Sequence, residues 1–495
     1  MSDNSAPASA TNNAPSTQMP PAFVRTDGDF KSASRKAAGN ERLKRAVTLN
    51  TLRQYTGRQQ RMNDLPDAEA LKDLAGRIRQ HALDNLDFYL DQLCRAVVRN
   101  GGHVHIAATA ADARDAVLRI ARESGCHRVI KSKSMVTEEI DLAGAMERAG
   151  LDVVETDLGE FIVQISHDRP SHLVAPIMHK DVESISRLFS EYFHVSCGTD
   201  PGELTALARA HLREKFRAAD MGMTGGNFLV AETGQVCVVE NEGNARQSMT
   251  TPRVLVSVVG IEKIVPRLPD LAVMLKLLAR SATGQAMTIY TNVFGGPRKP
   301  GEKDGPEEFH LVLVDNGRTD ILASEEYRPT LRCIRCGACL NACPVYRKIG
   351  GHAYGSVYSG PIGSLLTPLL WGLGEHRDLP QASTLCGACG EVCPVKIDIP
   401  RYLVGMRRDM VRGRLNGWFE RCVYRLWAWS MKRPRVYAIS SRLQKWELLR
   451  RAAGGGWISN LPMPAAGWTE VRDMPAPADR SFHQQWSRRR PEKKA

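Results

Sequence analysis

The chain has 495 residues, of which 43% are hydrophobic, a composition typical of a folded globular protein with about two to four domains. Lys and Arg number 67 against 54 Asp and Glu, a net charge of +13 that attracts anionic surfaces without distinguishing a membrane, a nucleic acid or an acidic protein. No stretch approaches the roughly 18–20 uncharged apolar residues of a transmembrane helix, so we expect no membrane span.

The N-terminal region changes character near residue 30. Residues 1–29 are rich in Ser, Ala, Asn and Pro and are predicted to be a disordered arm, because they have little apolar surface to bury. They lack the basic and apolar segments of a secretory signal, so we expect a cytoplasmic protein. Residues 30–64 are basic and rich in helix formers, which predicts a helical segment. Its charged surface is either exposed to solvent or binds a partner.

Residues 65–326 alternate between helical and strand-like patterns, which is typical of an α/β domain. The domain is predicted to begin with one long amphipathic helix over residues 67–100. Strands are expected at 103–108, 128–134, 151–157, 252–260, 286–294 and 308–316, with helices at 112–124 and 138–150. Two more strands over 227–241 should meet at Thr233-Gly234. The first three strands favour parallel pairing, so the sheet is predicted to be mixed.

Polar residues and glycines lie in loops or at strand ends of this domain, where α/β sheets bind ligands. Backbone N–H groups of the glycines could hold a carboxylate and a lysine could pair with it. The alternative is that these residues are turn glycines and surface charges. The candidate ligand-binding residues are Lys131, Lys133, Gly225, Gly226, Asn227 and Glu240. Neither a dinucleotide fingerprint nor a phosphate-binding loop occurs, so flavin and nicotinamide cofactors have no support.

Residues 327–410 hold seven of the twelve cysteines and are predicted to form a separate, helical metal-binding domain. The first motif, CIRCGACLNACP, has the C-x2-C-x2-C-x3-C-P spacing of two-cluster bacterial ferredoxins. Three thiolates on a tight loop can reach one cluster, while the fourth points toward the other. Structural zinc normally takes two CxxC pairs instead. We therefore expect two iron–sulfur clusters of the [4Fe–4S] type in a ferredoxin-like domain.

The second motif, STLCGACGEVCP, has Ser383 where the first motif has its leading cysteine. Crossing the fourth ligands, as in ferredoxins, assigns Cys333, Cys336, Cys339 and Cys393 to the first cluster. Cys343, Cys386 and Cys389 remain for the second cluster, which lacks one cysteine. Ser383, Cys422, Cys197, water or a partner could fill that position, or a three-iron cluster could leave it empty. An open iron could bind a substrate oxygen, although an oddly ligated electron-transfer cluster is the simpler interpretation.

Residues 411–495 are predicted to form a C-terminal helical region with a basic tail. The stretch 418–437 mixes Trp, Phe, Tyr and Leu with Arg and Lys, as an interfacial amphipathic helix does. The alternative is a helix packed on the cluster domain. A peripheral contact on the inner face of the membrane would suit a protein that donates electrons to a respiratory chain.

Taken together, these motifs closely resemble the lactate utilization protein B family. The resemblance is carried by KSKSMVTEEIDL, MGMTGGNFLVAETG and VVENEGN in the α/β region, by both cysteine motifs and by GWTEVRDMPAPADRSF near the C-terminus. It extends from about residue 30 to the C-terminal region, and the order of the motifs is specific.

The resemblance implies a function in L-lactate oxidation to pyruvate. It implies an α/β domain similar to the sugar-phosphate isomerase and coenzyme A transferase fold, in which Glu240 resembles a transferase nucleophile. It places the cluster ligands on the seven cysteines assigned above. It also implies two partners, a cysteine-rich iron–sulfur protein and a second protein with the same α/β domain.

Three functional hypotheses follow. The first is an electron-transfer subunit that depends on its partners and takes up electrons from a 2-hydroxy acid through the complex. The second is a self-sufficient 2-hydroxy acid dehydrogenase that binds its substrate at the three-cysteine cluster or in the α/β pocket. The third, a zinc-stabilised nucleic-acid-binding protein, rests on the net charge alone, so we expect no nucleic-acid partner.

Overall fold

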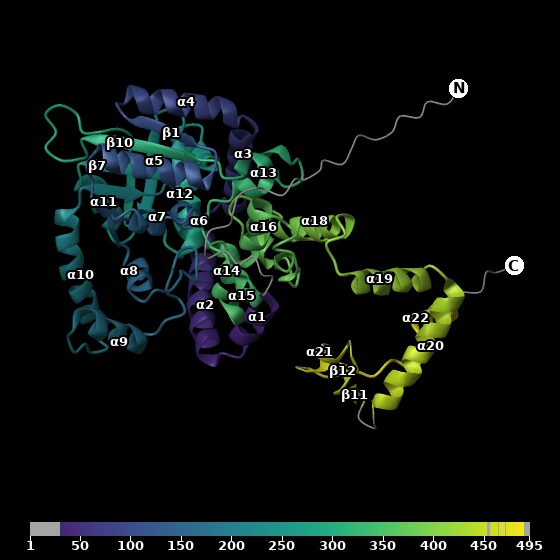
Figure 1. Cartoon of the computed structure of the whole chain (residues 1–495). Coiled ribbons are helices and arrows are strands. Elements are labelled where there is room, and N and C mark those ends of the chain that lie inside the picture. Colours follow the sequence, from purple (N-terminus) through teal and green to yellow (C-terminus); the bar gives the residue numbers. More distant parts are fainter. Residues whose placement is uncertain (1–29, 453–455, 464, 471, 490–495) are drawn as a thin grey trace, which may run out of the picture. The chain divides into compact units, whose positions relative to one another are not determined.

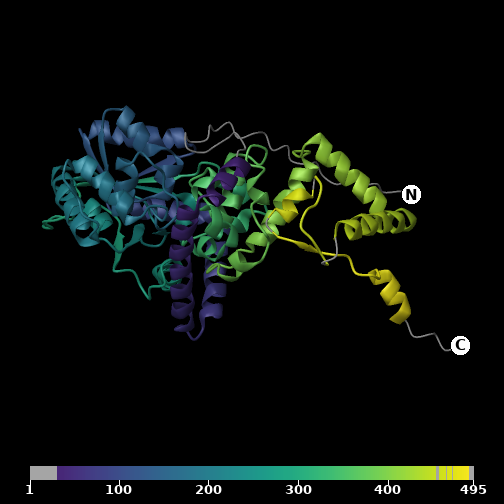
Figure 2. The same cartoon turned by 90° about the horizontal axis from the view of Figure 1, so that it is seen from below.

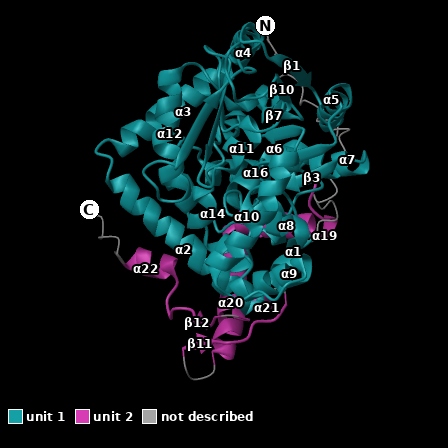
Figure 3. Cartoon of the chain, turned by 90° about the vertical axis from the view of Figure 1, so that its left-hand side faces the viewer, with its two compact units in different colours: residues 1–413 teal, residues 414–495 magenta. Residues whose placement is uncertain are grey.

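The computed structural model describes residues 30–452, 456–463, 465–470 and 472–489. The predicted disordered arm, residues 1–29, lies outside the described residues. The chain divides into two compact units, residues 1–413 and 414–495, which Figure 3 shows in different colours.

The first unit is built on a six-stranded parallel sheet in the order β1-β10-β7-β4-β2-β3 (Figure 1). Its strands are β1 (His103–Ala107), β2 (Arg128–Lys131), β3 (Asp152–Glu155), β4 (Met221–Thr224), β7 (Val254–Gly260) and β10 (Glu308–Val314). Strand β7 is buried along its whole length. Its neighbours β4 and β10 are also buried along almost their whole length, as expected for strands that are covered on both faces.

Antiparallel pairing occurs in a second, four-stranded sheet rather than at the edge of the first. Its order is β8-β5-β6-β9, with strands β5 (Phe228–Val230), β6 (Gln235–Glu240), β8 (Ile264–Val265) and β9 (Tyr290–Phe294). Strands β5 and β6 form the hairpin expected around Thr233-Gly234. Gly234 has a positive φ, and a Cβ there would lie 2.6 Å from the backbone of Ala96. Strands β5 and β8 pair parallel in this sheet, so the four-stranded sheet is mixed, whereas the six-stranded sheet is entirely parallel.

Alternate residues of β7 and β10 face two different apolar layers. Val256, Val258 and Val312 pack with helices α5 (Ala110–Glu123), α6 (Met135–Glu139) and α7 (Leu142–Arg148). Leu255 and Leu311, on the other face, pack with the second sheet and with α4 (Leu86–Arg99) and α11 (Asn244–Thr250). This period of two follows from the pleat of the strands. Beyond the edge strand β3, helices α8 (Leu158–Ile165), α9 (Val182–Phe193) and α10 (Pro201–Ala218) form their own aromatic cluster.

The prediction of one helix over residues 67–100 is wrong. The chain forms α3 (Ala68–Asp84) and α4, which are separated at Asn85. The side-chain amide of Asn85 donates to the carbonyl of His81 at 2.9 Å, a local bond that competes with regular helix. The helix expected at 138–150 is likewise divided into α6 and α7, because Asp141 adopts a left-handed backbone conformation.

The cysteine motifs lie in a helical layer that follows β10. Its elements are α13 (Arg318–Ala323), η2 (Arg328–Arg332), α14 (Ala338–Ala342), α15 (Pro344–Ile349), η3 (His352–Tyr354), α16 (Gly360–Trp371), η4 (Leu379–Gln381), α17 (Ala388–Glu391) and α18 (Ile399–Arg412). The N-terminal helices α1 (Phe30–Ala38) and α2 (Glu41–Asn63) pack beside α14 and α15, as Figures 1 and 2 both show. Helix α12 (Leu268–Ala282) completes the layer between α2 and α3.

A buried ionic network joins this helical layer to the α/β domain. The guanidinium of Arg318 donates to both oxygens of Glu139 at 2.8 Å and to Glu262, which follows β7 in η1 (Ile261–Lys263), at 2.6 Å. Glu262 also pairs with Arg335 of the first cysteine motif, and the Tyr358 hydroxyl donates to Glu139. Although burial opposes ionisation, Arg318 and Arg335 hold the pKa of Glu262 at about 2. The network is therefore charged inside the protein.

The second unit contains α19 (Trp418–Met431), α20 (Pro434–Arg451), β11 (Trp457–Ile458), α21 (Ala466–Thr469), β12 (Met474–Pro475) and α22 (Phe482–Arg489). Strands β11 and β12 pair antiparallel above a small core of Ala452, Ile458 and Leu461. Helices α19 and α20 bury none of their residues. Among the described residues of either unit, no helix combines the length and the continuous apolarity needed to cross a membrane.

We predict that Arg318→Met lowers the free energy of unfolding by about 3–5 kcal/mol, because it leaves the buried carboxylate of Glu139 without a cation and leaves Glu262 with Arg335 alone. Arg95→Met is the matched control, since Arg95 forms an exposed pair with Asp91 whose loss should cost at most about 1 kcal/mol. Urea unfolding followed by circular dichroism measures both. Equal unfolding midpoints for the two variants would contradict a stabilising role of the network.

Candidate metal centre

The loop of the first cysteine motif turns sharply at two left-handed residues, Arg335 and Gly337. These turns bring Cys333, Cys336 and Cys339 to one side of the loop. The backbone N–H of Arg335 donates to the sulfur of Cys333 at 3.4 Å. Cys343 follows as the N-cap of α15, where its sulfur accepts the N–H of Tyr346 at 3.4 Å and Pro344 takes the first helical position. The motif proline thus begins a new helix at the point where the fourth thiol must leave the loop.

The second motif repeats this local geometry around Leu385 and Gly387, which both have positive φ. Cys389 lies in α17, and the sulfur of Cys393 accepts the N–H of Ile397 at 3.3 Å. Cys389 and Cys393 are buried, whereas Cys386 is exposed. All twelve cysteines of the chain are free thiols, so none of these sulfurs is consumed by a disulfide.

One cavity is lined by four of these cysteines, three from the first motif and one from the second. They are Cys333, Cys336, Cys339 and Cys393. The rest of its wall is almost entirely apolar and includes Leu173, Ile334, Ile362, Val395, Ile397 and Ile399. Four convergent thiols in a cavity with an apolar wall are a donor set suited to an iron–sulfur cluster. The chain's own residues therefore fit the group that the motif spacing predicts.

The pKa values of these cysteines also depend on one another, which supports the same grouping. Burial, together with the charges of Cys333 and Cys393, raises the pKa of Cys336 to about 12. Burial raises the pKa of Cys393 to about 11, with Cys333 adding to the effect. Several buried thiolates cannot share this cavity without a compensating cation, because their negative charges repel one another in an apolar environment. A bound metal cluster supplies that positive charge.

The other three motif cysteines form a second group. Burial raises the pKa of Cys389 to about 12, and the next contributions come from Cys343 and Cys386. The Cys386 side chain places this group at the protein surface. The hydroxyl of Ser383 accepts the N–H of Leu385 at 3.1 Å, which gives it a local structural role in the turn. Cys197 packs instead with the aromatic cluster of α8–α10.

Buried cations surround the first cysteine group. The Arg58 guanidinium of α2 donates to the carbonyl of Val392 at 2.9 Å, next to Cys393. Arg79 of α3 is fully buried and donates to the carbonyls of Leu331 and Arg332, next to Cys333. Burial lowers the pKa of Lys263 to about 7, while Glu262 and Cys333 act against this shift. The two arginines offset the negative charge that cluster ligation brings into the protein interior.

The candidate ligand-binding residues of the α/β domain do not form one site. Lys131 ends β2 and pairs with Glu155 at 2.6 Å and Glu138 at 3.0 Å, while Lys133 pairs with the buried Glu160. Burial raises the pKa of Glu155, and the ion pair with Lys131 acts against that shift. The structure therefore brings the two lysines together with three carboxylates that sequence spacing did not single out as a group. Strands β2 and β3, which carry Lys131 and Glu155, are adjacent in the parallel sheet.

The other candidate ligand-binding residues have structural contacts with neighbouring residues of the α/β domain. A Cβ on Gly225 would lie 2.6 Å from the hydroxyl of Ser134, and one on Gly226 would lie 2.8 Å from Val259. The side-chain oxygen of Asn227 accepts the N–H of Val239 at 2.9 Å. The carboxylate of Glu240 accepts backbone N–H groups at the start of α11, from Ala245 at 2.8 Å and Arg246 at 2.7 Å, together with the amide of Asn292. Glu240 therefore caps a helix in this structure.

Comparison with known families assigns three consecutive segments. Residues 90–314 match the LUD domain, residues 329–397 match the 4Fe-4S dicluster domain, and residues 408–491 match the C-terminal region of lactate utilisation protein B. The two-cluster prediction for the cysteine region is confirmed by the second match. The proposed likeness of the α/β domain to sugar-phosphate isomerases and coenzyme A transferases stays a prediction.

Individual relatives match along almost the whole chain. Lactate utilization protein B from Bacillus licheniformis is 44% identical over 471 residues, which covers 94% of this chain and 97% of the relative. The protein of the same name from Anoxybacillus flavithermus is 43% identical and covers 94% and 98%. Among solved structures, a DUF162 family protein from Deinococcus radiodurans covers 46% of this chain and 98% of its own, at 13% identity and a TM-score of 0.27.

We predict that Cys393→Ser removes the same cluster signal as Cys333→Ser, although Cys393 belongs to the second motif. Both substitutions remove a thiol from the same cavity. Cys389→Ser should affect the other cluster, and Cys422→Ser in the second unit should leave both intact. Iron and sulfide analysis with EPR of the dithionite-reduced proteins measures this grouping. Matching spectra for Cys393→Ser and Cys389→Ser, distinct from that of Cys333→Ser, would show that the fourth ligands do not cross.

Proposed function

Because the chain belongs to the lactate utilization protein B family, we propose that it is the electron-transfer subunit of a complex that oxidises L-lactate to pyruvate. The observation that carries this proposal is the placement of two cysteine groups in one helical layer, one of them inside an apolar cavity. Bound [4Fe–4S] clusters supply one-electron chemistry. Oxidation of L-lactate to pyruvate releases two electrons and two protons, so two such clusters together could hold both electrons.

The two cysteine groups differ in their access to solvent. The cavity around Cys333 and Cys393 is lined almost entirely by apolar side chains, and its four cysteines are buried. The second group includes the exposed Cys386, so it can approach a redox partner. The charges of Cys339 and Cys389, one from each group, are close enough to influence each other, which fits electron exchange between the clusters. We therefore assign the contact with the partner to the second group and electron storage to the first.

The partners follow from the proposed complex. We propose that electrons come from L-lactate through a cysteine-rich iron–sulfur protein and a second protein with a LUD domain. The alternative is a self-sufficient 2-hydroxy acid dehydrogenase, for which the charged group around Lys131 and Lys133 would be the substrate pocket. That group has its lysines paired internally with Glu155, Glu138 and Glu160, so its positive charge is already compensated. This arrangement favours the electron-transfer subunit.

We predict that the anaerobically purified chain, loaded with iron and sulfide, stays oxidised when L-lactate is added. Dithionite should reduce it, and L-lactate should do so only after the two partner proteins are added. Visible absorption and EPR follow the clusters. Bleaching by L-lactate without partners would contradict the proposal and would place the substrate site in this chain.

The second unit has a composition that suits an anionic membrane surface. Residues 414–495 contain 17 Lys and Arg against 6 Asp and Glu, a net charge of +11, so they carry most of the chain's excess of +13. They also contain seven of its eight tryptophans. Tryptophan prefers the boundary between lipid and water, and basic residues are attracted to anionic headgroups.

The aromatic side chains of this unit are available for such a contact. Trp427 is 58% exposed, Trp446 is 64% exposed and Trp429 is 47% exposed. The guanidinium of Arg433 lies 4.4 Å from the Trp429 ring and that of Arg472 lies 3.9 Å from the Trp468 ring, so these tryptophans have basic neighbours. We propose that the second unit binds the anionic inner face of the membrane, close to an acceptor of the respiratory chain.

We predict that the full chain co-sediments with vesicles of phosphatidylglycerol and phosphatidylcholine, but not with phosphatidylcholine alone. The double substitution Trp427→Ala and Trp429→Ala should weaken this binding on the order of tenfold or more, because it removes two large apolar side chains. Phe88→Ala is the control, since Phe88 is equally exposed in the first unit. Unchanged sedimentation of the tryptophan variant, or none of the wild type, would contradict a membrane contact.

A further inference from the structure

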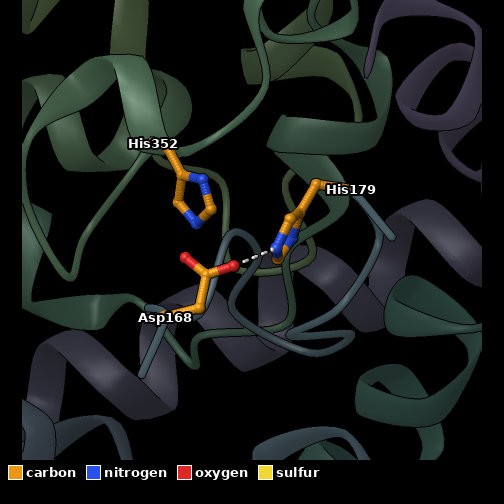
Figure 4. A group of neighbouring side chains, drawn as sticks. All are labelled: Asp168, His179 and His352. Carbon is orange, nitrogen blue, oxygen red and sulfur yellow. Dashed lines mark hydrogen bonds and ion pairs between the residues drawn. The ribbon is translucent and has the colours of Figure 1, made fainter. Parts of the chain in front are cut away.

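A cluster of two histidines and one aspartate lies apart from the cysteine groups (Figure 4). Asp168 and His179 belong to the loop between α8 and α9, and His352 begins η3 in the cysteine-bearing layer. One potential ligand atom from each side chain lies within 4.8 Å of the other two. Figure 4 shows the Asp168 carboxylate facing both imidazole rings. Two imidazoles and one carboxylate form a donor set common in zinc and non-haem iron sites.

The surrounding fold holds this cluster in place. The carbonyl of Ser171 accepts the buried hydroxyl of Tyr346 at 2.6 Å, which ties the loop to α15. A Cβ on Gly351 would lie 1.8 Å from the same carbonyl oxygen. Only glycine therefore fits at this position next to His352, where the backbone contacts the loop. The His179 and His352 rings meet edge to face with centroids 4.5 Å apart. Two segments distant in sequence are therefore locked together at this point.

The hydrogen bonds fix the protonation of His179. Its Nδ1 lies 2.9 Å from the Ser171 hydroxyl, which donates its own hydrogen to the carbonyl of Pro176 at 2.9 Å. The hydroxyl can therefore only accept, and Nδ1 must carry a proton. In the neutral ring the lone pair is then on Nε2, which faces the Asp168 carboxylate at 2.9 Å. Nε2 of His179 and the Asp168 carboxylate are therefore close enough to bind one cation together.

The other ligand candidates have oxygen neighbours as well. Nε2 of His352 donates to the carbonyl of Arg169 at 2.7 Å. The Oδ2 atom of Asp168 accepts from Lys180 at 2.9 Å as well as from His179, and its Oδ1 accepts the N–H of Arg169 at 2.8 Å. Hydrogen bonds of this kind to a ligating carboxylate and through the second nitrogen of a ligating histidine are typical around bound metals.

We propose that Asp168, His179 and His352 bind one divalent transition-metal ion, with Zn²⁺ as the best match to this donor set. The ion binds between Nε2 of His179 and the Asp168 carboxylate, where a proton would otherwise lie, so its binding releases a proton. It links the loop of the α/β domain to the cysteine-bearing layer. Three protein ligands leave a coordination position open to water.

The test uses the anaerobically purified full chain with its clusters. The protein is incubated with about one equivalent of Zn²⁺ and desalted, and zinc and iron are counted by mass spectrometry. We expect about one zinc per chain, with only nitrogen and oxygen neighbours at about 2.0–2.2 Å in X-ray absorption. Sulfur neighbours would show zinc in a cysteine site, and an absence of bound zinc would overturn the proposal.

Substitutions identify the ligands. His179→Gln and His352→Gln should each weaken zinc binding at least tenfold while iron and sulfide stay unchanged. His127→Gln is the control, because His127 is an exposed histidine outside the cluster and should bind zinc like the wild type. If the glutamine variants lose iron, zinc binding is measured on Asp168→Asn instead. This substitution removes the charge of the proposed ligand and keeps the size of the side chain. Wild-type zinc affinity in Asp168→Asn, or in iron-loaded glutamine variants, would overturn the proposal.

Discussion

The pairing of Arg318 with Glu139 and Glu262 is the interaction on which the first unit depends. It joins α6 and the end of β7, both in the α/β domain, to α13 at the start of the helical layer. Each group is almost fully buried, so none can be solvated if a partner is lost. Arg335 extends the pairing into the first cysteine motif, where its guanidinium lies 4.7 Å from the Tyr358 ring centroid. The position of the cysteine loop is thus set by charges of the α/β domain.

The charges around the first cysteine group affect the redox properties of a cluster bound there. A cluster held by four thiolates brings negative charge into an apolar cavity, and the surrounding arginines offset it. Arg58 and Arg79 come from α2 and α3, so residues more than 200 positions before the cysteine motifs complete their environment. The proposed electron-transfer function requires this combination of a shielded first group and a second group with an exposed cysteine. Net charge and solvent exposure are two of the factors that set cluster potentials.

The α/β domain contributes charged groups of two kinds. Around Lys131 and Lys133 the charges are paired with carboxylates inside the domain, so the group is self-contained. Around Asp168 and His179 the polar atoms face a histidine of the helical layer, so the group is complete only when both parts of the first unit are folded. A metal ion there would add a second link beside the ionic network. The second unit, with its exposed tryptophans and net charge of +11, has no comparable buried polar group among its described residues.

The sequence by itself determined the features that depend on local spacing. Cysteine spacing predicts two clusters because ligands on one tight loop must converge on one metal group, and the period of the apolar residues predicts the strands of the sheet. Asn85 and Asp141 interrupt predicted helices because local hydrogen bonding and a left-handed residue outweigh amphipathic periodicity there. Only the tertiary structure decided which distant side chains meet. Arg318 finds Glu139 from 179 positions away, and His352 meets His179 across two domains. No local pattern encodes such contacts, because they arise from the packing of whole elements.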